Sequence, residues 1–429
     1  MKLFERLFKH ITLAFLLCFF APSTASSPNN EPTLQADSIE ISLLTCGPRQ
    51  QVYSLYGHTA IRFQDKQSGR DIAINYGVFS FDQPFFVLRF VFGLTDYEMG
   101  IAPFDIFEWE YDPTGCGVRQ QVLNLTAQEK MAIAQAVDRN MEPQNRVYRY
   151  NFFYDNCTTR ARDIIANNLN GRIVYDSSTP QHLNTSTPQH HNTPAQYPTF
   201  RNLIHNYNET HRWARFGNDL LLGVKADYNT TFEQQQFLPE RLCADFERAY
   251  IISADGTKRN LVSSSFWLFE PTTKQQSIQQ TNMSILDVFS PLVTFSILSI
   301  LTLIIAIVEY RRKRIIWVFD TIIMLTTGTC GLLLFAMIFS QHPTVSLNLQ
   351  ILLLNPINIF MLYSVTKAAH KNRIHWWTKA WSALILLLLA GSFLQSYAEG
   401  ITIVALSLLL RNISNIYTFK NTGSKQPEA

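Results

Sequence analysis

Residues 286–308 read LDVFSPLVTFSILSILTLIIAIV, an apolar run with a single aspartate near its start. About 20 such residues cross the hydrocarbon core of a bilayer, and the run must be helical because lipid offers the backbone no hydrogen-bond partners. Apolar runs follow at residues 315–339, 345–366 and 380–397, and a weaker fifth at 400–417 contains Arg411. The sequence therefore predicts an all-α domain of five transmembrane helices over residues 285–417.

The loops between these runs predict the orientation of the chain. Residues 309–314 (EYRRKR) and 367–379 (KAAHKNRIHWWTK) are strongly basic, whereas the loops at 340–344 and 398–399 carry no Lys or Arg. Basic loops stay in the cytoplasm. We therefore expect these two loops and the tail at 418–429 to be cytoplasmic, and everything before residue 286 to lie outside.

The N-terminus supports export independently. Residues 1–27 read MKLFERLFKHITLAFLLCFFAPSTASS, with a basic start, an apolar stretch at 11–21 and small residues at 23–25. This order is typical of a secretory signal peptide, which we place at residues 1–25. An uncleaved anchor is the alternative, and both place the following segment outside the cytoplasm.

The composition of the chain excludes or disfavours several classes of protein. Of 429 residues, 47% are hydrophobic and 16% are charged, against about 25% charged in soluble domains. The apolar content excludes a wholly disordered chain. A net charge of +3 without a basic stripe in the polar half argues against nucleic acid as a partner. The sequence contains no P-loop, GxSxG or HExxH motif, which argues against nucleotide, serine-hydrolase and zinc-protease chemistry.

Residues 26–270 form the exported domain, and a Gln-rich linker at 271–284 joins it to the membrane helices. Short β-like runs at 39–44, 59–63 and 72–77, the last two separated by a polar turn at 65–70, predict strands. Helical spacing at 128–140 and a capped start at 157–169 predict helices. The mixture predicts an α+β fold. Inside it, the octads STPQHLNT and STPQHHNT within residues 177–196 indicate a low-complexity insertion; their histidines could bind metal, but duplication explains them and we predict neither metal nor cofactor.

Cys157 is the strongest candidate for chemistry. It lies in NFFYDNCTTRARD (151–163), at the start of a predicted helix. A helix N-terminus favours the thiolate because its free N–H groups carry positive partial charge. The alternative is a buried structural or disulfide cysteine, and among the other exported cysteines (Cys46, Cys116 and Cys243) a Cys46–Cys116 disulfide is possible.

A nucleophilic thiolate needs a base, and His58 in YGHTAIRF (56–63) is the best candidate, following the permissive Gly57. A third polar group should orient the imidazole. If the two strands around residues 66–69 form a hairpin, residues 75–77 lie opposite His58, within reach across the strands. Asn75 is therefore the preferred third residue, with Tyr76 and Asp82 as alternatives.

These motifs, together with TFRNLIH at 199–205 and five membrane helices, resemble the Lnb family of membrane-bound bacterial lipoprotein N-acyltransferases over residues 42–417. The resemblance implies a circularly permuted papain-like fold of the NlpC/P60 type, in which the histidine precedes the cysteine. It strengthens the assignment of Cys157 and His58 and does less for Asn75. Supporting or substrate-contact roles would fall to residues of the same motifs: Tyr56, Arg62, Tyr154, Asn156 and Arg160.

The resemblance also implies a reaction. The sn-2 acyl chain of a diacylglyceryl lipoprotein would move to the amine of its own N-terminal cysteine, which gives a lyso-form lipoprotein in the bacterial inner membrane. The partners would be such lipoproteins and membrane lipid. Phenylalanines 85, 86, 90 and 92 would line an acyl entrance or belong to the core. His342, in the loop at the exported membrane face, would contact substrate or serve only to cap the helix end locally. The rival predictions are a cysteine peptidase or amidase acting on cell-wall peptides, and a non-catalytic membrane receptor or scaffold.

Overall fold

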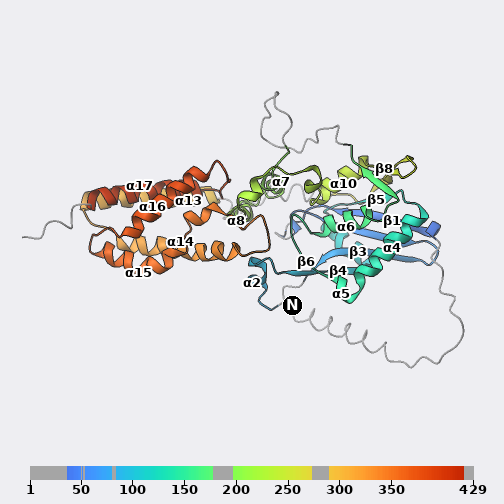
Figure 1. Cartoon of the computed structure of the whole chain (residues 1–429), viewed down its shortest axis with the longest axis horizontal. Helices are drawn as coiled ribbons and strands as arrows, with labels where there is room; N and C mark the ends of the chain where they lie inside the picture. Colours follow the sequence, from blue (N-terminus) through green and yellow to red (C-terminus); the bar gives the residue numbers. More distant parts are fainter. Residues whose placement is uncertain are drawn as a thin grey trace, which may run out of the picture. The chain divides into compact units, whose positions relative to one another are not determined.

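The computed structural model describes residues 36–49, 51, 54–79, 84–176, 197–272 and 289–419 (Figure 1). The predicted signal peptide, the octad repeat, most of the Gln-rich linker and the C-terminal tail lie outside the described residues. The remainder contains a mixed α/β region that ends at the linker and a helical region that follows it.

An antiparallel sheet of seven strands forms the exported domain. Its order is β10-β5-β1-β2-β3-β4-β6, with the strands β1 (Ile39–Cys46), β2 (His58–Asp65), β3 (Arg70–Val78), β4 (Asp96–Pro103), β5 (Val118–Leu123), β6 (Val147–Arg149) and β10 (Val262–Phe269). The three predicted strands are confirmed as β1, β2 and β3, and β2 and β3 form the predicted hairpin. A separate three-stranded sheet contains β7 (Gly171–Val174), β8 (Tyr250–Ser253) and β9 (Lys258–Asn260).

The apolar face of the large sheet packs against three helices, α4 (Ala127–Met141), α6 (Cys157–Ala166) and α10 (Pro239–Arg248). α4 and α6 confirm the two helices expected from the sequence. The other elements of this region are η1 (Ala36–Ser38), α2 (Phe86–Val91), α3 (Phe104–Tyr111), η3 (Asp112–Thr114), α5 (Pro143–Arg146), α7 (Phe200–His205), α8 (Arg212–Leu221), η4 (Val224–Asp227) and α9 (Phe232–Gln235). The predicted α+β class is therefore correct at the level of a mixed domain built on an antiparallel sheet.

The helical region contains α13 (Pro291–Arg312), α14 (Trp317–Met337), η5 (Leu349–Leu352), α15 (Ile357–His370), α16 (Trp376–Gly391) and α17 (Ile401–Phe419). Four segments of the described chain are long and apolar enough to cross a membrane, counting η5 and α15 as one. Of the five membrane-crossing helices predicted, these four are long enough in the structure, whereas the fourth run forms α16, an apolar helix of 16 residues, and its crossing of the membrane stays a prediction. The run at 400–417, expected to be the weakest, forms a helix of 19 residues.

Arg411 does not weaken α17, because its charge is neutralised inside the bundle. Its guanidinium donates to Glu309 of α13 at 2.7 and 2.9 Å and to Asp320 of α14 at 2.6 Å. Asn415, one turn further along α17, donates to the same Glu309 at 2.8 Å. Charged groups in a membrane domain persist when they pair with one another, so this cluster fastens three helices together.

The exported domain is docked on the outer ends of the membrane helices through α8 and η4. The backbone N–H groups of Gly223 and Val224 donate to the carbonyl groups of Thr344 and Leu347, both at 2.8 Å. The Gln350 side chain of η5 in turn donates to the carbonyl of Asp219 in α8 at 2.9 Å. Hydrogen bonds from both backbone and side chain therefore join the two regions at defined positions.

Arg201 of α7 binds two carboxylates of the segment from α8 to η4 that contacts the membrane domain. Its buried guanidinium bonds Asp219 at 2.8 Å and Asp227 at 2.8 Å. Both carboxylates belong to the α8–η4 segment, and the Asp227 carboxylate also accepts from the backbone N–H of Ser396 at 3.2 Å. The ion pairs therefore stiffen the segment that contacts the membrane domain.

Candidate active site

A cavity of about 360 Å³ opens where the carboxyl end of β1, the start of β2 and the N-terminus of α6 meet. The residues that line it come from several parts of the exported domain and include Tyr56, Gly57, His58, Asn75, Gly77, Phe79, Tyr97, Glu110, Tyr150, Asn156, Cys157 and Phe237. Cys157, His58 and Asn75, predicted from separate motifs, therefore share one cavity.

Cys157 is the first residue of α6, and Asn156 caps that helix. The side-chain oxygen of Asn156 accepts from the backbone N–H groups of Thr158 and Thr159, both at 2.9 Å, which satisfies two donors that a helix start leaves unpaired. Its amide nitrogen donates to the carbonyl groups of Phe152 and Phe237, both at 2.9 Å. Four bonds from one side chain thus hold the Cys157 end of the helix in place.

His58 begins β2, directly after Gly57, whose φ of +77° is open to glycine at little cost. The β2–β3 register pairs Ala60 with Asn75, so His58 and Asn75 lie near each other on one face. Nε2 of His58 lies 3.1 Å from Oδ1 of Asn75. Since an amide oxygen only accepts, Nε2 carries the proton, which leaves Nδ1 for the contact with Cys157.

A hydroxyl pair fixes the strand against the helix beside these groups. The side-chain oxygens of Thr59 on β2 and Thr158 on α6 lie 3.1 Å apart, and both residues are buried. Because Thr59 follows His58 and Thr158 follows Cys157 in the chain, this bond joins the strand that carries the imidazole to the helix that carries the thiol. Gly77 lies beside the thiol, because a Cβ there would lie 3.7 Å from Cβ of Cys157, and its φ of +111° is one that glycine adopts readily.

The electrostatics favour a thiolate paired with an imidazolium. Burial opposes ionisation of Cys157, but the charge of His58 and hydrogen bonds from His58, the Thr59 backbone and Thr158 outweigh it and lower the pKa of the thiol to about 7. Burial likewise opposes protonation of His58, yet the Cys157 charge and hydrogen bonds to Cys157 and Asn75 raise its pKa. Both shifts stabilise the same charged pair.

Aromatic side chains from distant parts of the chain complete the wall. The rings of Tyr97 and Tyr150 stack with centroids 4.0 Å apart, and Phe79 stacks on Tyr97 at 4.9 Å. Burial raises the pKa of Tyr97 to about 12 and that of Tyr150 well above its usual range, so both hydroxyls are neutral. The motifs at His58 and Cys157 carried no signal for these tyrosines.

Two of the supporting residues predicted from the motifs line the cavity. Tyr56 lines the cavity, and its hydroxyl accepts a hydrogen bond from Asn218 of α8 at 2.7 Å. Asn156, the cap of α6, also lines the cavity. Tyr76 also lines the cavity, but its hydroxyl is occupied by Asn140 at 2.9 Å. Asp82 lies outside the described residues.

Three other predicted residues serve structural contacts outside the lining. Arg62 bonds Asp71 through two nitrogens at 2.6 and 2.9 Å. Arg160 does the same with Asp155 at 2.6 and 2.8 Å. Tyr154 packs edge-on against Phe200. The interpretation that these residues contact substrate has no support from their positions.

His342 lies in the outer loop after α14, as predicted, but it does not line the cavity. Its ring borders the turn after α2, where a Cβ on Gly93 would lie 3.0 Å from it. Burial lowers its pKa, so the ring is neutral at pH 7. Further along, Asn355 and Pro356 separate η5 from α15, and the Asn355 side-chain oxygen accepts a hydrogen bond from the backbone N–H of Ile357 at 3.0 Å.

The other exported cysteines are free thiols, so the disulfide considered between Cys46 and Cys116 is not formed in the structure. Burial raises the pKa of Cys46 well above its ordinary value and raises that of Cys243 as well. The pKa of Cys157 is therefore shifted in the opposite direction from those of Cys46 and Cys243.

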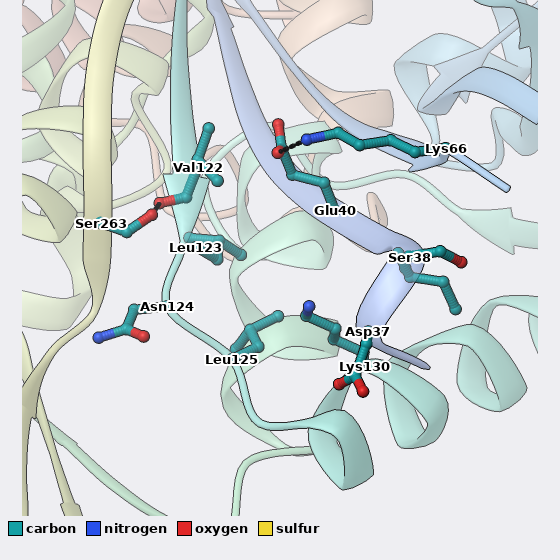
Figure 2. Close-up of a pocket in the computed structure, with 11 residues that line it drawn as sticks. Asp37, Ser38, Glu40, Lys66, Val122, Leu123, Asn124, Leu125, Lys130 and Ser263 are labelled. Atoms are coloured by element: carbon teal, nitrogen blue, oxygen red, sulfur yellow. Dashed lines mark hydrogen bonds and ion pairs between the residues drawn. The ribbon is translucent and has the colours of Figure 1, made fainter. Parts of the chain in front are cut away.

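A second cavity, of about 240 Å³, lies at the opposite end of β1 and β5 (Figure 2). Figure 2 shows the ion pair at its rim, in which Lys66 contacts Glu40 at 2.8 Å, and the Ser263 hydroxyl, which donates to the carbonyl of Val122 at 3.1 Å. The residues lining it include neither cysteine nor histidine. Among the residues that the structure describes, no three His, Cys, Asp or Glu side chains gather as a metal-binding group.

An exported α/β domain docked on membrane helices defines a multi-pass membrane protein with a periplasmic N-terminal domain. Residues 27–203 match the Lnb N-terminal periplasmic domain, and residues 280–422 match the Lnb transmembrane domain. The chain therefore belongs to the Lnb family, which indicates a membrane enzyme that modifies lipoproteins. No curated protein and no solved structure matches the chain.

Proposed function

We propose that this protein moves the sn-2 acyl chain of a diacylglyceryl lipoprotein to the amine of the lipoprotein's own N-terminal cysteine. The observation that carries the proposal is the Cys157–His58–Asn75 arrangement in a cavity of the exported domain. His58 on a strand that precedes a helix opened by Cys157 also supports the permuted papain-like relationship expected from the sequence. We propose Cys157, His58 and Asn75 as the catalytic residues.

The first half-reaction is attack by the Cys157 thiolate on the carbonyl carbon of the sn-2 ester. The C–O bond of the ester breaks, a thioester forms on Cys157, and the leaving glycerol oxygen takes a proton from His58. Of the backbone N–H groups at the start of α6, the Asn156 cap accepts from those of Thr158 and Thr159, so the N–H of Cys157 is the one that would donate to the oxyanion.

In the second half-reaction the lipoprotein amine attacks the thioester carbonyl. An amide bond forms, the C–S bond breaks, and the amine proton passes to His58, which restores the thiolate–imidazolium pair. Asn75 keeps Nε2 protonated and Nδ1 turned to the sulfur throughout. The exchange of an ester for an amide requires no further reactant.

The test is mass spectrometry of the N-terminal peptide of a reporter lipoprotein. A host that lacks its own N-acyltransferase would express the wild-type chain, Cys157→Ala, or Cys243→Ala as a matched control of a buried thiol. We expect an N-acyl chain to appear, and one chain to leave glycerol, with wild type and Cys243→Ala only.

Other results would overturn the proposal. Three acyl chains on the peptide would mean an external donor and hence a different reaction. An unmodified lipoprotein would exclude lipoprotein acylation as the activity of this protein and would favour a peptidase that acts on cell-wall peptides. Normal acylation by Cys157→Ala would exclude the thiol mechanism.

A further inference from the structure

We propose that α2 is inserted in the outer leaflet of the bilayer and that a row of aromatic side chains leads an acyl chain from it to Cys157. The insertion of α2 in the bilayer is independent of the proposed function, whereas the path of the acyl chain to Cys157 rests on it. The helix reads FVLRFV and follows Phe85, so apart from Arg89 every side chain is apolar.

The exposure of α2 is unusual for a water-soluble surface. Phe85 is 78% exposed, Val87 71%, Leu88 56% and Phe90 50%. The one charged side chain, Arg89, pairs with Asp96 at the start of β4 and so stays with the domain. A contiguous exposed apolar patch of this kind marks an interaction surface.

The position of α2 selects a bilayer as the partner. The backbone N–H of Gln341, after the outer end of α14, donates to the carbonyl of Phe92 at 3.0 Å. Val91, the buried residue of α2, packs in one cluster with Met337 and Val345 of the membrane domain. The turn of chain that ends α2 is therefore fixed at the level where α14 leaves the membrane.

The surface of α14 beside this contact is also apolar and exposed. Ile338 and Phe339, immediately before the loop that bonds α2, are 42% and 65% exposed. A lipid-facing helix carries such side chains because lipid covers them. The exposed face of α2 continues this surface, and helices with aromatic and aliphatic side chains at that level lie in the headgroup–acyl boundary.

An aromatic row connects α2 with the cavity. The ring of Phe90 stacks on that of Phe86, and the ring of Phe86 stacks on that of Phe79, with centroids 6.5 Å apart in both pairs. Phe79 lines the cavity that contains Cys157 and stacks on Tyr97 at 4.9 Å. An acyl chain leaving the outer leaflet at α2 would remain in contact with these rings until its ester reached Cys157.

The first half is tested with the full-length protein in phospholipid nanodiscs. The photoreactive residue p-benzoyl-phenylalanine replaces Leu88, or Phe266 as a control that is 45% exposed on β10 at the other edge of the sheet. After irradiation, mass spectrometry should find phospholipid adducts at position 88 and none at 266. Absence of adducts at 88, or equal adducts at both positions, would overturn the insertion of α2 whatever the chemistry of the protein.

The second half is tested by chain-length selectivity. Acylation of Cys157 by the p-nitrophenyl esters of acetate and palmitate is followed as a burst of p-nitrophenolate. Phe86→Ala should lower the palmitate-to-acetate rate ratio about tenfold, the scale of a lost apolar contact, whereas Phe266→Ala should leave the ratio unchanged. An unchanged ratio in Phe86→Ala would overturn the aromatic row. A wild-type protein without any burst at Cys157 would instead overturn the proposed function.

Discussion

Replacement of His58 by alanine should return the Cys157 thiol to ordinary or weaker acidity. Burial is the largest influence on this thiol and opposes ionisation, and the two largest influences that favour the thiolate both come from His58. Without them, the pKa should rise from about 7 to at least the ordinary value of 9.0. Two pKa units correspond to about 2.7 kcal/mol of lost thiolate stabilisation.

The effect on reactivity can be calculated at pH 7. About half of the Cys157 side chains are thiolate when the pKa is 7 and about 1% when it is 9, a loss of about 50-fold in reactive species. A more basic thiolate is intrinsically more nucleophilic, which recovers about eightfold over two units. The net decrease in alkylation rate at pH 7 is therefore about sixfold or more.

The assay is peptide-resolved mass spectrometry of iodoacetamide alkylation at Cys157 in the full-length protein, from pH 5 to pH 10. In the wild type the rate should rise with a midpoint near pH 7, and in His58→Ala the midpoint should lie at or above pH 9. His211→Ala, on a histidine elsewhere in the exported domain, should keep the wild-type midpoint. A midpoint that stays near 7 in His58→Ala would refute the assignment of the pKa shift to His58.

Three further outcomes follow from the same contacts. N-acylation should have a bell-shaped pH profile, rising through about pH 7 as Cys157 loses its proton and falling at higher pH, as His58 loses the proton that the leaving glycerol oxygen needs. Asn156→Ala removes two helix-capping bonds and the bonds to one buried and one partly buried carbonyl group, so chemical denaturation should show a loss of about 2–4 kcal/mol together with slower alkylation of Cys157. Arg411→Met leaves the buried carboxylate of Glu309 without its cation and should destabilise the membrane domain by about 3–5 kcal/mol in detergent, measured by thermal unfolding.

Matched control variants distinguish these specific effects from an unspecific loss of stability. Thr126→Ala removes the cap of α4 and should cost about 1 kcal/mol without changing alkylation of Cys157. Lys66→Met breaks an exposed ion pair with Glu40 and should change stability by at most about 1 kcal/mol. A pH profile that rises without falling would contradict the role of His58 as the acid. Equal alkylation of Cys157 in Asn156→Ala and wild type would contradict the role of the helix cap. Equal stability of Arg411→Met and Lys66→Met would contradict the importance of the buried ion pair.

Features set by neighbours in the chain were predictable from the sequence. The apolar runs, the basic loops and the β2–β3 hairpin depend on local pattern, and the hairpin brings His58 to Asn75 over a separation of 17 residues. The start of α6 at Cys157 was predictable for the same reason, since Asn156 caps the helix from the adjacent position. That Cys157 reaches His58 could be expected only as a requirement of the chemistry.

Tertiary structure alone decided which residues surround the pair and which charges are tolerated in the membrane. Arg411 weakened the prediction of the last helix, because its partner Glu309 lies 102 residues away and no local pattern reveals it. The wall formed by Tyr97 and Tyr150 and the role of Arg62 and Arg160 as structural ion-pair partners were likewise hidden. Local sequence determines where helices and strands form through hydrogen bonding and apolar periodicity. Burial arises only when distant segments exclude water together, and so does the contact with His58 that lowers the pKa of Cys157 in spite of that burial.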